Sequence, residues 1–192
     1  VDPGAPAYGG TPADASVVHA IAELKARGLK VTLCPFILMD FDGFPWRGRI
    51  SGEAADVPPL FGSASPSDIV IDGDQIDHDC ADWGLRRMVL HQARLAQLAG
   101  GVDSFLIGSE LRGITTIRDG VGAYPAVDAL RALAADCRAI LGPGTAIGYA
   151  ADWTEYFGHQ PADGSGDVAF HLDPLWADEA IDFVGIDFYL PL

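Results

Sequence analysis

Long apolar runs alternate with helix-like segments along this chain of 192 residues. The runs lack the polar alternation of a half-exposed strand, which is typical of parallel strands buried on both faces. They span 31–39, 102–107, 146–150 and 183–189. Segments with apolar residues at helical spacing precede them, at 14–28, 81–99, 126–141 and 174–180. Strict alternation of helix and strand predicts right-handed crossovers and a parallel α/β sheet.

Two architectures fit this order, a doubly wound open sheet and part of a (β/α)₈ TIM barrel. The chain has no G-x-G-x-x-G motif after its first strand and no G-x-x-x-x-G-K-[ST] motif, so the nucleotide-binding doubly wound folds lose support. A complete barrel needs about 250 residues. We therefore predict that residues 1–192 are part of a single TIM-barrel-like domain cut from a longer chain. Residues 40–80 form a long segment without a regular pattern, which is typical of a functional loop.

The net charge of the chain limits the classes of molecule that it can bind. With 27 acidic and 12 basic residues, the formal net charge is −15. Such a surface repels phosphate backbones, so we expect no nucleic-acid partner, whereas a neutral polysaccharide is compatible. No apolar run reaches the roughly 18 residues of a membrane span. We expect no cofactor, no metal and no disulfide, because Cys34, Cys80 and Cys137 are odd in number and lack metal-ligand spacing.

Carboxylates stand where the predicted strands end. Catalytic groups of a parallel barrel lie at the carboxyl ends of its strands and in the loops that follow. The acidic residues at these positions are Asp40, Glu110, Asp152 and Asp187, and the aromatic ones include Trp153 and Tyr189. Carboxylates for proton transfer beside rings that stack on sugars predict a site that cleaves sugars.

Two of these strands resemble known strands of glycoside hydrolases. The run FLIGSEL at 105–111 resembles the end of the fourth barrel strand in the large clan of retaining enzymes, where the Glu of a Gly-Asn-Glu motif is the general acid/base. The run IDFVGIDFY at 181–189 resembles the sixth strand, which ends in a sugar-facing aromatic residue. The resemblance implies that the chain holds about strands three to six and that Glu110 is the acid/base.

More narrowly, the whole chain resembles the glycoside-hydrolase-like barrel domain of the large tail protein, or baseplate hub, of gene transfer agents and tailed phages. The motifs CPFILMD at 34–40, IGSELRG at 107–113 and YAADWTEY at 149–156 carry this resemblance. It implies hydrolysis of a cell-envelope polysaccharide by a protein of a phage-like tail. It also implies assembly in the cytoplasm with other tail proteins as partners.

Two departures from the clan leave the enzyme assignment open. Ser109 stands in place of the Asn that contacts the sugar 2-hydroxyl. The clan's nucleophile ends the seventh strand, and a retaining site needs its second carboxyl about 5–5.5 Å from the first. Residues 1–192 alone are therefore expected to be inactive. The alternative is a non-catalytic structural or glycan-binding tail module that kept the barrel.

Several candidate residues have a structural alternative. Glu110 would form an ion pair with Arg112 or another arginine at the barrel mouth. Ser109 and Asp187 are expected to bind substrate. Three further residues would contact substrate or else pack under the top loops of the barrel: Asp152, Trp153 and Tyr189.

Two sets of acidic residues in the predicted loop also have both a functional and a structural interpretation. Asp40 and Asp42 either bind sugar hydroxyls or cap the turn after their strand. The cluster Asp72, Asp74, Asp77 and Asp79 either binds calcium or is a solvated loop that leads into a helix N-terminus, and its spacing does not match an EF-hand.

Overall fold

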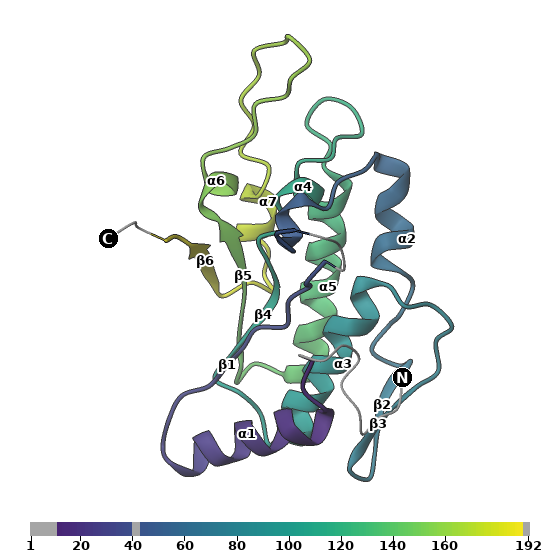
Figure 1. The fold of residues 1–192 in the computed structure, drawn as a ribbon, viewed down its shortest axis with the longest axis vertical. Helices are drawn as coiled ribbons and strands as arrows, with labels where there is room; N and C mark the ends of the chain where they lie inside the picture. Colours follow the sequence, from purple (N-terminus) through teal and green to yellow (C-terminus); the bar gives the residue numbers. More distant parts are fainter. Residues whose placement is uncertain (1–10, 40–42, 190–192) are drawn as a thin grey trace.

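The parallel sheet determines the architecture. The structure is a computed structural model, and it describes residues 11–39 and 43–189 (Figure 1). Within them, a four-stranded parallel sheet has the order β1-β4-β5-β6. Its strands are β1 (Thr32–Leu33), β4 (Ser104–Ser109), β5 (Ala146–Asp152) and β6 (Phe183–Asp187). Each strand pairs with the next strand of this sheet along the chain, whereas a doubly wound sheet reverses its order at a switch point. The prediction of a parallel α/β sheet is confirmed.

Long helices pack against the sheet and hold the core. They are α1 (Asp14–Ala26), α3 (Leu85–Leu98) and α5 (Pro125–Leu141). Helices α3 and α5 contact each other and β4, α5 also contacts β5, and α1 packs on α3. Phe105, Ile107 and Ile147 alternate along the strands and are fully buried. Burial of such a side chain stabilises the fold by about 1.5–3 kcal/mol.

Short helices gather where the strands end. They are α4 (Arg112–Thr115), α6 (Trp153–Tyr156) and α7 (Asp173–Trp176), and they lie at the upper end of the sheet in Figure 1. Two loops project beyond them, one between α4 and α5 and one between α6 and α7. Arg118 of the first loop donates to Asp163 of the second at 2.8 Å. The two loops are therefore tied together.

The described part of the long segment at 40–80 has more regular secondary structure than predicted. It contains the 3-10 turns η1 (Arg47–Arg49) and η2 (Ala54–Asp56), the helix α2 (Val57–Phe61), and an antiparallel hairpin of β2 (Ile69–Asp72) and β3 (Gln75–His78). Gly73 lies in the two-residue turn between these strands and has a φ of 64°. Glycine favours such a conformation, so its presence in the turn was a sequence signal for the hairpin. The expectation of an irregular loop was wrong here.

The acidic cluster lies on this hairpin rather than at a helix start. Asp72 and Asp77 belong to its strands and Asp74 to its turn, while α3 begins only at Leu85. Among residues 11–39 and 43–189, no group of three or more His, Cys, Asp or Glu side chains is arranged to hold a metal ion.

The first strand is much shorter than the predicted run at 31–39. Pro35 has no N–H to donate, and β1 ends before it. Leu38 instead forms an isolated antiparallel bridge with Trp46. The chain therefore folds back, with residues 43–49 lying beside the end of β4. Asp40 and Asp42 lie outside the described residues.

The three cysteines form no disulfide. Cys34, Cys80 and Cys137 are all free, and Cys137 is fully buried. In the described part of the chain, no helix is both long and apolar enough to cross a bilayer.

Candidate functional site

Glu110 has an unusual backbone. It follows β4 directly, and among the described residues it is the one non-glycine residue with a positive φ, 50°. Its N–H donates to the carbonyl of Ala150 at 2.7 Å. The next N–H, of Leu111, donates to the buried hydroxyl of Tyr149 at 2.8 Å. A left-handed conformation costs such a residue on the order of 1–3 kcal/mol and persists only where the surroundings impose it. Two neighbouring hydrogen bonds impose it here.

The carboxylate of Glu110 is buried and paired. Glu110 is 7% exposed. Its Oε2 accepts a hydrogen bond from Nε1 of Trp46 at 2.9 Å and forms an ion pair with the guanidinium of Arg47 at 2.8 Å. Both partners come from the folded-back segment after β1. The arginine that pairs with Glu110 is therefore Arg47, whereas the sequence had named Arg112 first.

Arg47 joins Glu110 to two further candidates. Its guanidinium donates to the carbonyl and to Oγ of Ser109, each at 2.6 Å. Oγ of Ser109 donates to Oδ2 of Asp187 at 2.9 Å. Three predicted site residues at the ends of β4 and β6 are thus connected by hydrogen bonds and an ion pair: Ser109, Glu110 and Asp187. We call Trp46, Arg47, Ser109, Glu110 and Asp187 the Glu110 network.

Two glycines allow Arg47 to reach this position. A Cβ on Gly48 would lie 2.4 Å from the ring of Trp46. A Cβ on Gly113 would lie 2.2 Å from the carbonyl oxygen of Ile50, where α4 packs on η1. A side chain at Gly113 would push η1 away from α4, and one at Gly48 would displace the ring of Trp46, which donates to Glu110.

Two residues of the run after β1 border the network. The ring of Phe36 lies 4.9 Å from the guanidinium carbon of Arg47, in a cation–π contact. Burial raises the pKa of the Cys34 thiol, and the carboxylate of Asp187 adds to this effect while Arg47 opposes it. Cys34 itself is half-buried at the edge of the site.

A second buried glutamate lies behind the first. Glu155 of α6 accepts hydrogen bonds from Oγ1 of Thr115 at 2.6 Å, the hydroxyl of Tyr149 at 3.0 Å and the N–H of Asp152 at 2.7 Å. Burial raises its pKa to about 7. Nε2 of His171 lies 3.3 Å from Oγ1 of Thr115. We call Thr115, Tyr149, Glu155 and His171 the Glu155 network.

His171 is the other titratable member of this network. It is 3% exposed, and burial lowers its pKa to about 4, with a smaller effect of His159. Neither His171 nor Glu155 was singled out in the sequence analysis. The signal for Glu155 was the spacing of a capping box, since Asp152 is the N-cap of α6 and Glu155 its N3 residue.

The remaining predicted residues lie outside the Glu110 network. Asp152 is 7% exposed and its Oδ1 accepts from the N–H of Thr154 at 2.9 Å, so it caps α6, a role that the sequence analysis did not give it. Trp153 is 42% exposed and Tyr189 is 80% exposed. Trp153 meets the ring of Phe188 edge to face, with ring centroids 5.7 Å apart.

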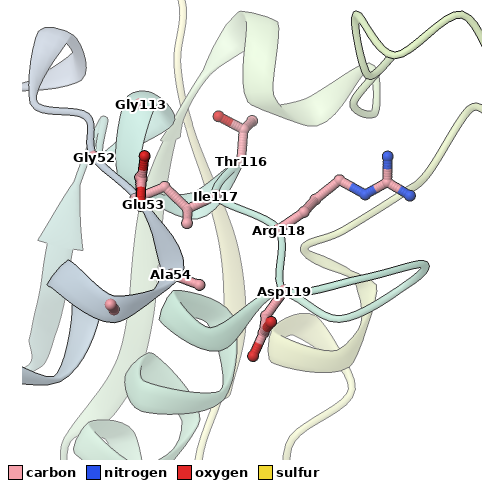
Figure 2. A pocket seen from close by; sticks show the side chains of 9 residues that line it. Gly52, Glu53, Ala54, Gly113, Thr116, Ile117, Arg118 and Asp119 are labelled. Atoms are coloured by element: carbon pink, nitrogen blue, oxygen red, sulfur yellow. The ribbon is translucent and has the colours of Figure 1, made fainter.

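A large hollow on the surface does not coincide with this chemistry. It has a volume of about 820 Å³ and is lined by residues of η2 and α4 and of the loop after α4. Figure 2 shows that the Arg118 side chain extends away from Glu53. None of the predicted site residues lines it. The cavity that touches Arg47 and Ser109 has only about 10 Å³, the room of about one water molecule. We place the candidate site at the Glu110 network, because buried paired charges are found there.

A parallel sheet in sequential order, with carboxylates at the ends of its strands, defines the chain as part of a TIM-barrel-like domain. The model of the family described as "GTA TIM-barrel-like domain", where GTA stands for gene transfer agent, matches residues 83–192. The chain belongs to this family, which confirms the resemblance and the partial barrel seen in the sequence. No curated protein matches the chain.

Proposed function

We propose that this domain hydrolyses a cell-envelope polysaccharide by a retaining mechanism, with Glu110 as acid/base. The proposal rests on the strained backbone of Glu110 at the carboxyl end of β4. Strained non-glycine residues cluster at functional sites, and this end of a barrel strand is where catalytic groups lie. The family supports a phage-like particle. Assembly of a tail in the cytoplasm, with other tail proteins as partners, belongs to the same proposal.

The contacts indicate what the chemistry requires. Glu110 would first protonate the glycosidic oxygen and later act as the base that activates water. Its Oε2 is bound to Trp46 and Arg47, so the proton for the glycosidic oxygen has to come from Oε1 unless the ion pair with Arg47 opens. Ser109 is already bound to Arg47 and Asp187, and it reaches a sugar hydroxyl only when those contacts open.

A second candidate function is favoured by one observation. The buried ion pair between Glu110 and Arg47 leaves a cavity of about 10 Å³ beside it, too small for a sugar. A closed network of this kind suits a non-catalytic structural or glycan-binding tail module. In this alternative Glu110 and Arg47 stabilise the barrel mouth.

Hydrolysis by the full-length protein distinguishes the two functions. Peptidoglycan and neutral polysaccharides are offered to the wild type, to Glu110→Gln and to the control Glu179→Gln, which makes the same change at an exposed carboxylate. We expect Glu110→Gln to lose at least about 100-fold in rate, the usual effect of removing a general acid. The control should retain the wild-type rate. Absence of cleavage by a folded wild type on every substrate would leave the non-catalytic function.

A further inference from the structure

A second cavity lies between α6 and α7, at the strand ends but outside the Glu110 network. Its volume is about 310 Å³, the lower end of the range of about 300–1,000 Å³ for small-molecule sites. Its lining residues are mostly aromatic or acidic: Glu155, Tyr156, Phe157, Phe170, Leu172, Asp173 and Trp176. We propose that this cavity, the α6–α7 pocket, is a binding subsite for one end of a neutral saccharide chain. The inference rests on the proposed function, because it names a subsite of the same glycan.

The rings of the pocket are accessible. Tyr156, Phe157 and Phe170 are 52%, 64% and 58% exposed. Tyr156 and Phe157 meet at a tilt, with centroids 6.5 Å apart, and do not stack face to face. Each ring therefore keeps a face that can lie against the C–H face of a sugar. Trp176 is half-buried and packs on Tyr149, which makes it a fixed wall of the pocket.

A row of rings extends the pocket along the strand ends. Phe157 meets Trp153 edge to face, with ring centroids 5.7 Å apart, and Trp153 meets Phe188 at the same separation. Phe188 directly follows β6, so the row runs from the pocket to the end of this strand. The subsite therefore suits a polymer better than a single sugar.

The polar lining selects the class of ligand. Asp173 is exposed at the pocket and offers carboxylate oxygens that accept hydrogen bonds from hydroxyl groups. Glu155 contributes only a wall, because Thr115, Tyr149 and the N–H of Asp152 already donate to it. An anionic ligand is repelled by Asp173 and by the net charge of −15. Rings with acceptor oxygens and no cation fit a neutral polyhydroxyl chain.

Binding by a catalytically silent protein tests this subsite. Full-length protein carrying Glu110→Gln is titrated calorimetrically with chitohexaose, a neutral hexamer of N-acetylglucosamine, and with an anionic hexagalacturonate. In this background we compare Phe157→Ala and Phe170→Ala with Trp83→Ala, which removes an exposed ring that does not line the pocket. We expect each pocket variant to weaken chitohexaose binding by about three- to tenfold, the range for one aromatic contact. Trp83→Ala should leave Kd unchanged, and hexagalacturonate should bind more weakly.

Each outcome decides the inference separately from the enzyme proposal. Unchanged Kd in both pocket variants, or no binding of chitohexaose, overturns the subsite even if Glu110 proves essential for hydrolysis. Weakened binding supports the subsite even if the wild type cleaves nothing. A change in oligomeric state of the pocket variants, with no effect on Kd, assigns the rings to a protein contact and overturns the subsite.

Discussion

Two buried glutamates stand after neighbouring strands of the sheet and differ in their partners. Glu110, after β4, is paired with the cation Arg47 and receives a bond from Trp46. Glu155, after β5, receives bonds only from neutral groups, including Tyr149, and burial raises its pKa to about 7. The position of a carboxyl group at the end of a barrel strand therefore does not determine its chemical role. Its neighbours determine whether it is a compensated charge or a weak acid.

The hydroxyl of Tyr149 lies between the two glutamates. It donates to Glu155 and accepts from the N–H of Leu111, the residue after Glu110. The Glu155 network therefore supports the strained turn on which Glu110 stands. The two regions are linked through the backbone, although only one of them contains a cation.

The largest expected effect comes from removing that cation. Arg47→Met leaves the carboxylate of Glu110 buried without its partner, because both side chains are little exposed. We expect a loss of about 3–5 kcal/mol in the free energy of unfolding, measured by urea denaturation.

A double-mutant cycle sharpens this prediction. Arg47→Met combined with Glu110→Gln removes both charges, so most of the lost stability should return. If the double variant is as unstable as the sum of the single variants, the ion pair contributes nothing specific. Arg47→Lys is the matched control that keeps the charge without the planar fork.

The pH dependence of stability tests Glu155. Its pKa rises from 4.5 to about 7 on folding, so the folded state holds a proton that the unfolded state releases. Stability therefore falls as pH rises from 4.5 to 7, by on the order of 3 kcal/mol at about 1.4 kcal/mol per pKa unit. Glu155→Gln removes this fall. The difference in unfolding free energy between wild type and variant, followed by urea denaturation across pH 4–8, measures it.

His171 acts in the opposite direction. Its pKa falls from 6.5 to about 4 on folding, so it adds stability as pH rises through that interval. Because His171 is present in both proteins, its contribution cancels in the difference between wild type and Glu155→Gln. A difference that does not change with pH would show that Glu155 is ionised when folded, like an ordinary surface carboxylate.

The smallest of these effects tests the link through Tyr149. Tyr149→Phe leaves the N–H of Leu111 without its acceptor in a buried position. We expect a loss of about 1–3 kcal/mol in unfolding free energy, the cost of one buried unsatisfied donor. Hydrogen exchange should also speed up at Leu111, whereas the N–H of Ile107 within β4 should stay protected. An equal increase in exchange rate at both amides would instead indicate that the variant destabilises β4 as a whole.

Much of the fold was predictable from local pattern. The apolar run at 146–150 became β5 and the helical spacing at 126–141 became α5, since buried strands and amphipathic helices leave a periodic signal. The length of the first strand was overestimated, because the prediction followed the apolar residues and ignored Pro35, which interrupts the strand. The hairpin of β2 and β3 was missed although its turn, Gly73-Asp74, had a recognisable Gly-Asp signal.

The sequence by itself determined the class of the molecule: a parallel α/β chain with carboxylates after its strands, an acidic surface and a family motif around Glu110. These features depend on residue type and short spacing. Only the tertiary structure decided that Arg47, 63 positions before Glu110, pairs with it, and that Tyr149 joins Glu110 to Glu155. Such contacts depend on how a folded-back loop packs on strands distant in sequence, and no local periodicity records that packing.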